Sequence, residues 1–339
     1  MSFSSLKKHL QLLFILCTVF SVAACKKNIG VRNPGTQPVE VFDELWNFMD
    51  KHYALFPQKQ VDWRNTYNEL RPQANNNLSD LELARLLNTM LLTLKDGHVN
   101  LITRSDTTTY TGFYTAYPAN FNYRILITGY LNNSFKTAGP VIYKVVTGIG
   151  YMYLGSFGET ISDKQLDDLF NDLKETKGLI VDVRNNTGGQ GQNATNLFSR
   201  FLSEKKLVKY EVVKKDIGHS DFFDPIPFYI SPAAAPYLKP VALLTNRACF
   251  SACNDFVLYM SLLPNVQQVG DQTGGGGGNP YNYILANGWK LQYTGMYSLS
   301  PDKKSIELGI APDFPVEISS QEEIEGRDPI IDRAIELLK

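Results

Sequence analysis

The chain predicts an α/β fold, because apolar strand-like runs alternate with amphipathic helical runs over its second half. A region of helical periodicity comes before them and begins near residue 39. The composition is that of an ordinary globular protein, with 43% hydrophobic and 20% charged residues. The net charge of −1 gives no electrostatic footprint for nucleic acid, so we expect no nucleic-acid partner.

The N-terminus carries an export signal. Two lysines precede an apolar run over residues 10–20, and Val22-Ala-Ala-Cys25 follows it. This pattern predicts a signal peptide over residues 1–24, whose apolar run is too short to span a bilayer. The small residues before the cysteine resemble a bacterial lipobox, which implies cleavage before Cys25 and lipidation of Cys25. An ordinary secretory signal and an uncleaved anchor are the alternatives.

Residues 25–38 are polar and contain glycine and proline, which predicts a flexible tether between the lipid and the folded body. We therefore expect a lipid-anchored protein of the bacterial cell envelope, at the periplasmic face of the outer membrane. The residues themselves leave the membrane face open, as they leave the oligomeric state open.

An N-terminal helical domain is predicted over residues 39–100. Apolar residues recur at spacings of three and four from residue 39 to 53, and a second helix is predicted over 63–70. A third helix begins after Ser79-Asp80, a good N-cap, and ends near Lys95. This helical cap leads directly to His98.

The second predicted domain covers residues 101–339. Residues 101–142 are rich in Thr, Tyr, Phe and Asn, which predicts strands and loops and shows no evident PDZ pattern. Ala286-Asn-Gly288 is a strong hairpin signal between strands at 281–285 and 289–293. The remaining elements predicted in order are strands at 141–146 and 150–154, a helix at 163–173, a strand from 179, a helix from 193, strands at 207–213 and from 241, a helix from 252, a strand at 266–269 and a helix at 327–338.

Ser251 lies where the strand ending at Asn246 gives way to the helix beginning near Ala252. A hydroxyl at that junction is near unpaired helix N–H groups and the positive end of the helix dipole, which suits a nucleophile. An ordinary N-cap is the alternative.

His98 is the best candidate for a base that activates this serine. The chain has four histidines. His9 lies in the leader, His52 on an amphipathic helix and His219 in a polar loop. His98 follows a predicted helix end in Leu94-Lys-Asp-Gly-His98. A loop histidine bonded to backbone is the alternative interpretation.

A third segment runs from the apolar strand at 178–184 into Asn185-Asn-Thr-Gly188-Gly189 and a helix start. Consecutive glycines let backbone N–H groups face a ligand without Cβ obstruction, so the turn can form half of an oxyanion hole. A plain strand-to-helix turn is the alternative.

Four motifs in this order resemble one family: Asp-Gly-His, Asp-Val-Arg-Asn-Asn-x-Gly-Gly, Ser-Ala-x-Asn-Asp-Phe and Val-Gly-Asp-x-Thr-Gly-Gly. The chain is similar to the C-terminal processing (tail-specific) serine peptidases, in their tricorn-like branch, from about residue 39 onward. The resemblance implies a Clp-protease/crotonase-like spiral core. It implies Ser251 as nucleophile, His98 as base, and an oxyanion hole from the N–H of Ala252 with that of Gly188 or Gly189.

The chain departs from the family at several positions. Gly274 to Gly278 stand where the Ser–Lys branch carries a lysine, which argues for His98 as the base. Gly97 stands where the tricorn protease has a serine before its histidine. Glu307 matches the region of the family's acidic partner, so we expect Glu307 to be the third catalytic residue, with Asp96 and Asp313 as competitors.

These features together predict a serine endopeptidase that hydrolyses peptide bonds of exported or unfolded proteins, with polypeptides as substrates and no cofactor or metal. A non-catalytic peptide-binding lipoprotein on the same fold is the alternative, and a hydrolase of other acyl substrates is a further one. No Gly-x-Ser-x-Gly elbow surrounds Ser251, which counts against an α/β-hydrolase. Cys249 and Cys253 are expected to be small buried side chains.

Overall fold

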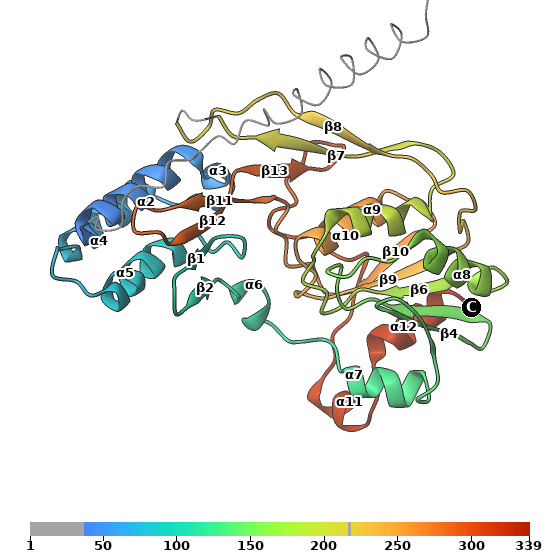
Figure 1. The fold of residues 1–339 in the computed structure, drawn as a ribbon. Helices are drawn as coiled ribbons and strands as arrows, with labels where there is room; N and C mark the ends of the chain where they lie inside the picture. Colours follow the sequence, from blue (N-terminus) through green and yellow to red (C-terminus); the bar gives the residue numbers. More distant parts are fainter. Residues whose placement is uncertain (1–36, 216–217) are drawn as a thin grey trace, which may run out of the picture.

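The computed structural model describes residues 37–215 and 218–339 and has the predicted α/β class (Figure 1). A layer of N-terminal helices with a small sheet lies at one side of the molecule, and a larger sheet covered by helices lies at the other. The predicted signal peptide, Cys25 and nearly all of the predicted tether fall outside the described residues. No helix in the described ranges is long and apolar enough to cross a membrane.

The N-terminal helices form where the periodicity predicts them. They are α2 (Pro38–His52), α3 (Phe56–Lys59), α4 (Trp63–Leu70), a 3-10 turn at Arg71–Gln73 and α5 (Asp80–Leu92). Reciprocal capping bonds begin two of them, between Gln37 and Glu40 in α2 and between Ser79 and Glu82 in α5. The apolar stripe of α2 is buried against the other helices of this layer.

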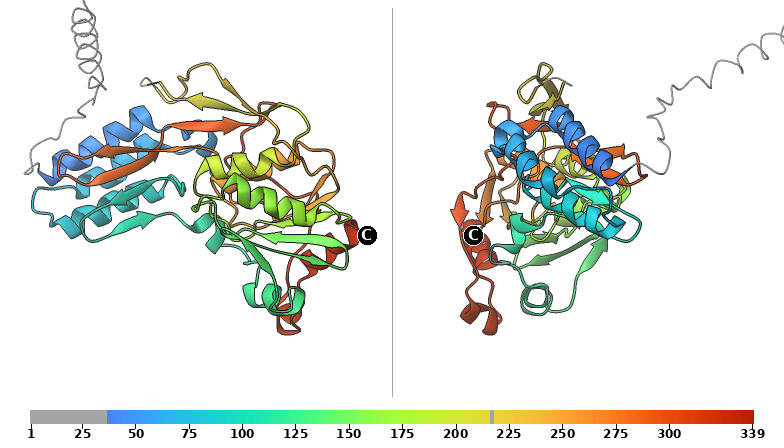
Figure 2. Two further views of the ribbon diagram at one scale, coloured as in Figure 1. Left: turned by 45° about the vertical axis from the view of Figure 1, so that its right-hand side comes forward. Right: turned by 90° about the vertical axis from the view of Figure 1, so that its left-hand side faces the viewer.

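These helices pack on a four-stranded antiparallel sheet drawn from both ends of the chain (Figure 2). Its order is β11-β12-β1-β2, with β1 at Asn100–Ile102, β2 at Thr107–Thr109, β11 at Pro280–Ile284 and β12 at Lys290–Thr294. The hairpin formed by β11 and β12 is the one that Ala286-Asn-Gly288 predicts. Because Leu285, Trp289 and Leu291 share one apolar cluster with the helices, the hairpin belongs structurally to the N-terminal layer.

The large sheet has the order β14-β10-β9-β6-β5-β4-β3 and is parallel from β14 to β5. Its strands are β3 (Lys136–Ala138), β4 (Val141–Val146), β5 (Ile149–Tyr153), β6 (Leu179–Asp182), β9 (Val241–Thr245), β10 (Val266–Gly270) and β14 (Phe314–Pro315). The central strands β6 and β9 are buried at every position, as expected for parallel strands covered on both faces.

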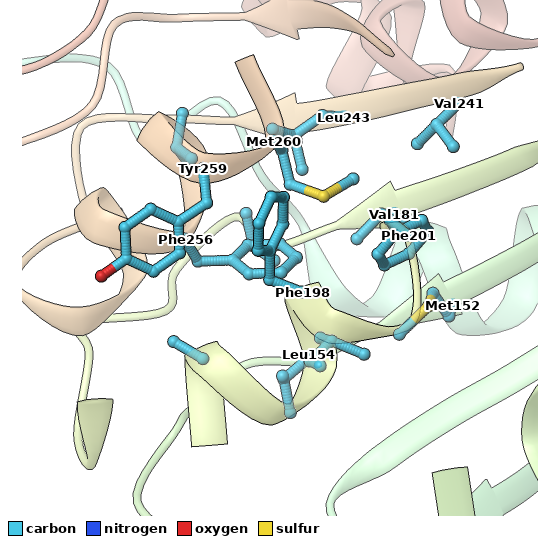
Figure 3. Packing of buried hydrophobic residues seen from close by; sticks show 14 of the residues in the cluster. Met152, Leu154, Val181, Phe198, Phe201, Val241, Leu243, Phe256, Tyr259 and Met260 are labelled. Atoms are coloured by element: carbon cyan, nitrogen blue, oxygen red, sulfur yellow. The ribbon is translucent and has the colours of Figure 1, made fainter. Parts of the chain in front are cut away.

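Successive residues of these strands enter two different cores. Val181 and Leu243 face α8 (Asp163–Leu173), α9 (Gly191–Ser199) and α10 (Ala252–Ser261), in the packing shown in Figure 3. Ile180 and Leu244 face α12 (Pro329–Leu337) on the opposite side. The helices therefore sandwich the sheet, and α10 begins at its carboxyl edge.

A third sheet, in the order β13-β7-β8, lies near the top of Figure 1, above α9 and α10 in that view. It contains β7 (Lys206–Val213), β8 (Ile226–Ile230) and β13 (Met296–Leu299), of which the sequence predicted β7.

The segment from 101 to 142 differs from its prediction of strands and loops. It contains short helical turns as well, at α6 (Gly112–Thr115), α7 (Tyr123–Ile125) and the π-turn Leu126–Tyr130. The Asn122 side chain accepts hydrogen bonds from the N–H groups of Arg124 and Ile125 and so starts the second turn. Turns this short show no readable periodicity. The short helix α11 (Ser320–Ile324) completes the described elements.

Candidate active site

Ser251 lies between β9 and α10 in a backbone conformation that non-glycine residues rarely adopt, with φ 57° and ψ −124°. Its N–H donates to the carbonyl of Gly275 at 3.0 Å. Its side chain makes no capping bond to the helix that follows. The hydroxyl is therefore not engaged as an N-cap, and such local strain is typical of functional turns.

His98 reaches this hydroxyl from far away in the chain. Its Nε2 lies 2.9 Å from Ser251 Oγ, across 153 positions of sequence. The ring is 7% exposed and packs on Phe250 at 4.7 Å between centroids. Burial lowers the pKa of His98, with Asp96 and Asp255 opposing that shift and Lys59 adding to it. A neutral imidazole can accept the hydroxyl proton at neutral pH.

The glycine turn after β6 packs directly on the nucleophile turn. A Cβ at Gly188 would lie 2.7 Å from the carbonyl oxygen of Phe250 and 2.8 Å from the Cβ of Ser251. The N–H of Gly188 already donates to Asn186 Oδ1 at 2.9 Å. Gly189 and Ala252 line the same cavity as Ser251 and His98, a space of about 370 Å³. Of the two predicted glycine donors, the geometry therefore favours Gly189.

Glu307 lies in a neighbouring cavity of about 670 Å³ rather than in the one over Ser251. It is 3% exposed, its Oε1 forms an ion pair with Lys59 Nζ at 2.8 Å, and its Oε2 accepts from the N–H of Gly277 at 3.1 Å. Burial raises its pKa to about 7, against the opposing effect of Lys59. Within the described ranges no hydrogen bond joins Glu307 to His98, and His98 Nδ1 has no partner there.

The two competing aspartates have different surroundings. Asp96 accepts the N–H of His98 at 2.8 Å through Oδ1. Its Oδ2 accepts the hydroxyls of Tyr53 at 3.0 Å and Thr294 at 2.7 Å. Asp313 accepts the N–H of Gln268 at 2.8 Å. The Asp96 side chain thus supports His98 through the main-chain N–H of His98. The identity of a third catalytic residue stays a prediction.

The five glycines after Thr273 join the two halves of the site. The carbonyl of Gly275 accepts from Ser251, and the N–H of Gly276 donates to the carbonyl of Glu307 at 3.1 Å. A Cβ at Gly275, where φ is 83°, would lie 1.9 Å from that same carbonyl oxygen. The segment therefore needs glycine to pass between the nucleophile turn and Glu307.

Sequence reasoning missed several residues that shape the site. They are Tyr53, Lys59, Asn186 and Thr294. Tyr53, Lys59 and Thr294 act through contacts with distant segments that no local pattern shows. Asn186, just before the glycine turn, was the one that the turn's own composition could have indicated. Cys249 and Cys253 are free and buried, as expected.

Comparison with known proteins identifies the family. The model of peptidase family S41 matches residues 148–316, and the model of the tricorn protease C1 domain matches residues 34–92. A carboxy-terminal-processing protease of Bartonella bacilliformis is 27% identical over 200 residues, which is 56% of this chain and 43% of that protein. This chain therefore spans less than half the length of this curated relative.

Solved structures extend the match over nearly the whole chain. The crystal structure of a candidate peptidase from Parabacteroides merdae is 42% identical, covers 90% of this chain and 97% of its own, and superposes with a TM-score of 0.86. The structure of mature CPAF is 12% identical with a TM-score of 0.67, covers 89% of this chain and 96% of its own, and shares the fold. The chain therefore belongs to peptidase family S41, the serine-type peptidases.

Proposed function

We propose that the protein is a serine endopeptidase that cleaves exported or unfolded polypeptides, with Ser251 as nucleophile and His98 as general base. The observation that carries the proposal is the 2.9 Å contact between His98 Nε2 and a serine hydroxyl that does not cap its own helix. The cavity over these two side chains gives a peptide access to both of them.

In the first half of the reaction, His98 Nε2 takes the proton while Ser251 Oγ bonds to the peptide carbonyl carbon. The N–H groups of Ala252 and Gly189 stabilise the oxyanion. Because Ala252 is the first residue of α10, the positive end of the helix dipole adds to this stabilisation. Collapse of this intermediate breaks the C–N bond, and His98 protonates the leaving amine. In the second half, His98 takes a proton from a water molecule whose oxygen bonds to the acyl carbon, the ester C–O bond to Ser251 breaks, and His98 returns the proton to Ser251 Oγ as the carboxylic acid product leaves.

The test is covalent labelling with a fluorophosphonate, read by intact mass on the chain from Lys26 onward. The parent should gain one adduct, and Ser251→Ala should gain none. His98→Ala should react about 10²- to 10⁴-fold more slowly, the usual contribution of a general base. Ser261→Ala is the matched control, because this serine lies on the same helix and its hydroxyl bonds to the carbonyl of Leu258.

Each other outcome points to a different function. A folded parent that gains no adduct would favour the alternative function, a non-catalytic peptide-binding protein on the same fold. An adduct that survives Ser251→Ala would mean another nucleophile. A labelled parent that cleaves p-nitrophenyl esters but no unfolded protein would be an esterase.

We also propose that the protein is lipid-anchored through Cys25 in the bacterial cell envelope, at the periplasmic face of the outer membrane. The support is the small-small-cysteine ending of the apolar leader. Mass analysis of the N-terminal peptide from the membrane fraction tests this. A peptide that begins at another residue, or a Cys25 without lipid, would contradict it.

A further inference from the structure

Lys59 is the last residue of α3, far in sequence from every predicted catalytic residue. Its side chain is only 11% exposed. The ammonium group forms an ion pair with Glu307 Oε1 at 2.8 Å and donates to the carbonyl of Lys95 at 3.1 Å. A lysine buried to this degree is uncommon and requires such partners.

The two partners lie on different loops of the site. The carbonyl of Lys95 belongs to the loop that carries His98, three residues further on. Glu307 belongs to the loop that Gly276 and Gly277 contact behind the nucleophile turn. One ammonium group therefore joins the loop of the base to the segment that supports the nucleophile.

A second contact ties the same N-terminal region to the loop of the base. Tyr53 directly follows α2 as its C-cap, and its hydroxyl donates to Asp96 Oδ2, while Asp96 Oδ1 accepts from the N–H of His98. The β12 residue Thr294 adds another hydroxyl donor to Asp96. The position of His98 thus depends on donors outside its own loop.

Negative groups outnumber positive groups around the Lys59 ammonium. Glu307 and Asp96 are two buried carboxylates, and Lys59 is the cation that both of them influence. Tyr53 faces the two carboxylates, and Tyr110 adds to the surroundings of Lys59. His98 is influenced by Asp96, Lys59 and Asp255, and Asp255 is itself paired with Lys209 at 2.9 Å.

Removal of the Lys59 ammonium group would raise the pKa of both Glu307 and His98. Burial raises the pKa of Glu307 to about 7 and Lys59 opposes that rise, so without Lys59 the carboxyl would stay protonated to higher pH. Lys59 also lowers the pKa of His98, so without it the imidazole would hold its proton to higher pH.

We propose that Lys59 is a positioning residue of the active site, supplied by the N-terminal helical region, which orients the loop of His98 through the carbonyl of Lys95 and holds Glu307 in an ion pair. The proposal rests on the proposed function, because it assigns Lys59 a role in the reaction of Ser251 and His98.

The test compares Lys59→Met, Lys59→Gln and Lys59→Arg for kcat, KM and the pH dependence of kcat/KM. Lys59→Met should lower kcat about 10- to 100-fold, the scale of a misplaced catalytic group, with KM nearly unchanged. The acid limb of its kcat/KM profile should move to higher pH, because Lys59 lowers the pKa of His98. Lys59→Gln keeps a hydrogen-bond donor for the carbonyl of Lys95 and loses the charge. The acid limb of its kcat/KM profile should therefore move to higher pH, with a smaller loss of kcat than in Lys59→Met. Lys59→Arg keeps the charge, so the acid limb of its profile should match that of the parent.

Lys51→Met is the matched control, since it removes an exposed lysine from the neighbouring helix α2. Thermal unfolding of every variant identifies those that do not fold. If Lys59→Met does not fold, Lys59→Gln alone decides the matter through its acid limb. A folded variant without the charge that keeps the parent kcat and pH profile would overturn the proposal while the proposed function stands.

A second readout does not depend on turnover. In the Ser251→Ala background, NMR titration of the His98 ring should show a higher pKa in Lys59→Gln than in the parent, with His98→Gln used to assign the signal. An unchanged pKa would contradict the proposal. A parent that shows no Ser251-dependent reaction at all would instead overturn the proposed function and the role of Lys59 in it.

Discussion

Two buried clusters in this protein each place one cation beside two carboxylates, and they are built differently. At the end of β6, Arg184 binds Asp182 at 2.7 Å and Asp328 at 2.8 Å, and all three side chains are at most 1% exposed. Beside the base, Lys59 binds Glu307 at 2.8 Å and influences Asp96. Both clusters contain one cation and two carboxylates, but the carboxylates of the Arg184 cluster accept more hydrogen bonds than Glu307 does.

The Arg184 cluster is saturated with donors. Asp182 accepts from the backbone N–H, Nε and Nη2 of Arg184 and from the hydroxyl of Tyr151. Asp328 accepts from Arg184 and from two N–H groups at the start of α12, where it is the N-cap. Glu307 has the ammonium of Lys59 and the N–H of Gly277. The first cluster is suited to structure, and the second can titrate near neutral pH.

Breaking the saturated cluster should have the largest effect. Arg184→Met would leave Asp182 and Asp328 buried without their cation, which typically costs about 3–5 kcal/mol in the free energy of unfolding. Urea unfolding measures that loss. Lys164→Met is the control, because its i,i+4 pair with Asp168 is exposed to solvent and its loss should leave the free energy of unfolding nearly unchanged. A loss below about 1 kcal/mol in Arg184→Met would show that the cluster is not structural.

The turn that follows Arg184 offers the next largest effect. Gly188→Ala should lower kcat roughly 10²- to 10³-fold, the scale of losing an oxyanion donor, because the new Cβ would push the glycine turn away from Phe250 and Ser251. Hydrolysis of a peptide substrate measures this.

Gly148→Ala provides the matched control. Gly148 also has a positive φ, 84°, but a Cβ added there would meet no atom within 4 Å. This variant should lose about 1–2 kcal/mol of stability from backbone strain and keep parent activity. Equal kcat in Gly188→Ala and Gly148→Ala would show that the glycine turn at Gly188 has no part in the reaction.

The clusters also show what the sequence could reveal. The nucleophile side is local, because a strand, a turn and a helix follow one another in the chain around Gly188 and again around Ser251. The pairing of Ser251 with His98 came from elimination among the histidines and from the family resemblance. The structure brings these two side chains together, whereas Glu307 contacts Lys59 instead of His98.

The rest depends on contacts between distant segments, which carry no periodicity. The hairpin around Asn287 was predicted from its turn, yet its packing on the N-terminal helices could not be, since either face of the hairpin has apolar residues. Lys59 looks like any lysine at a helix end. Its role follows from burial, which is a property of the assembled fold.

The smallest of the three effects concerns the unsaturated cluster and its response to pH. The pKa of Glu307 in the folded protein is raised to about 7 by burial, above its ordinary value of 4.5. The folded state therefore binds more protons than the unfolded state between these pH values, so the free energy of unfolding falls as pH rises through this window. The full shift corresponds to about 3 kcal/mol at most.

Glu307→Gln removes this titrating group, so its free energy of unfolding should change less than that of the parent between pH 4.5 and about 7. Urea unfolding at several pH values measures both curves. Ser251→Ala is the matched control, because it alters the same site without removing a group that titrates in this range, and its curve should run parallel to that of the parent. Parallel curves for Glu307→Gln as well would place the pH response of the fold elsewhere and would make the Lys59 cluster as purely structural as the cluster around Arg184.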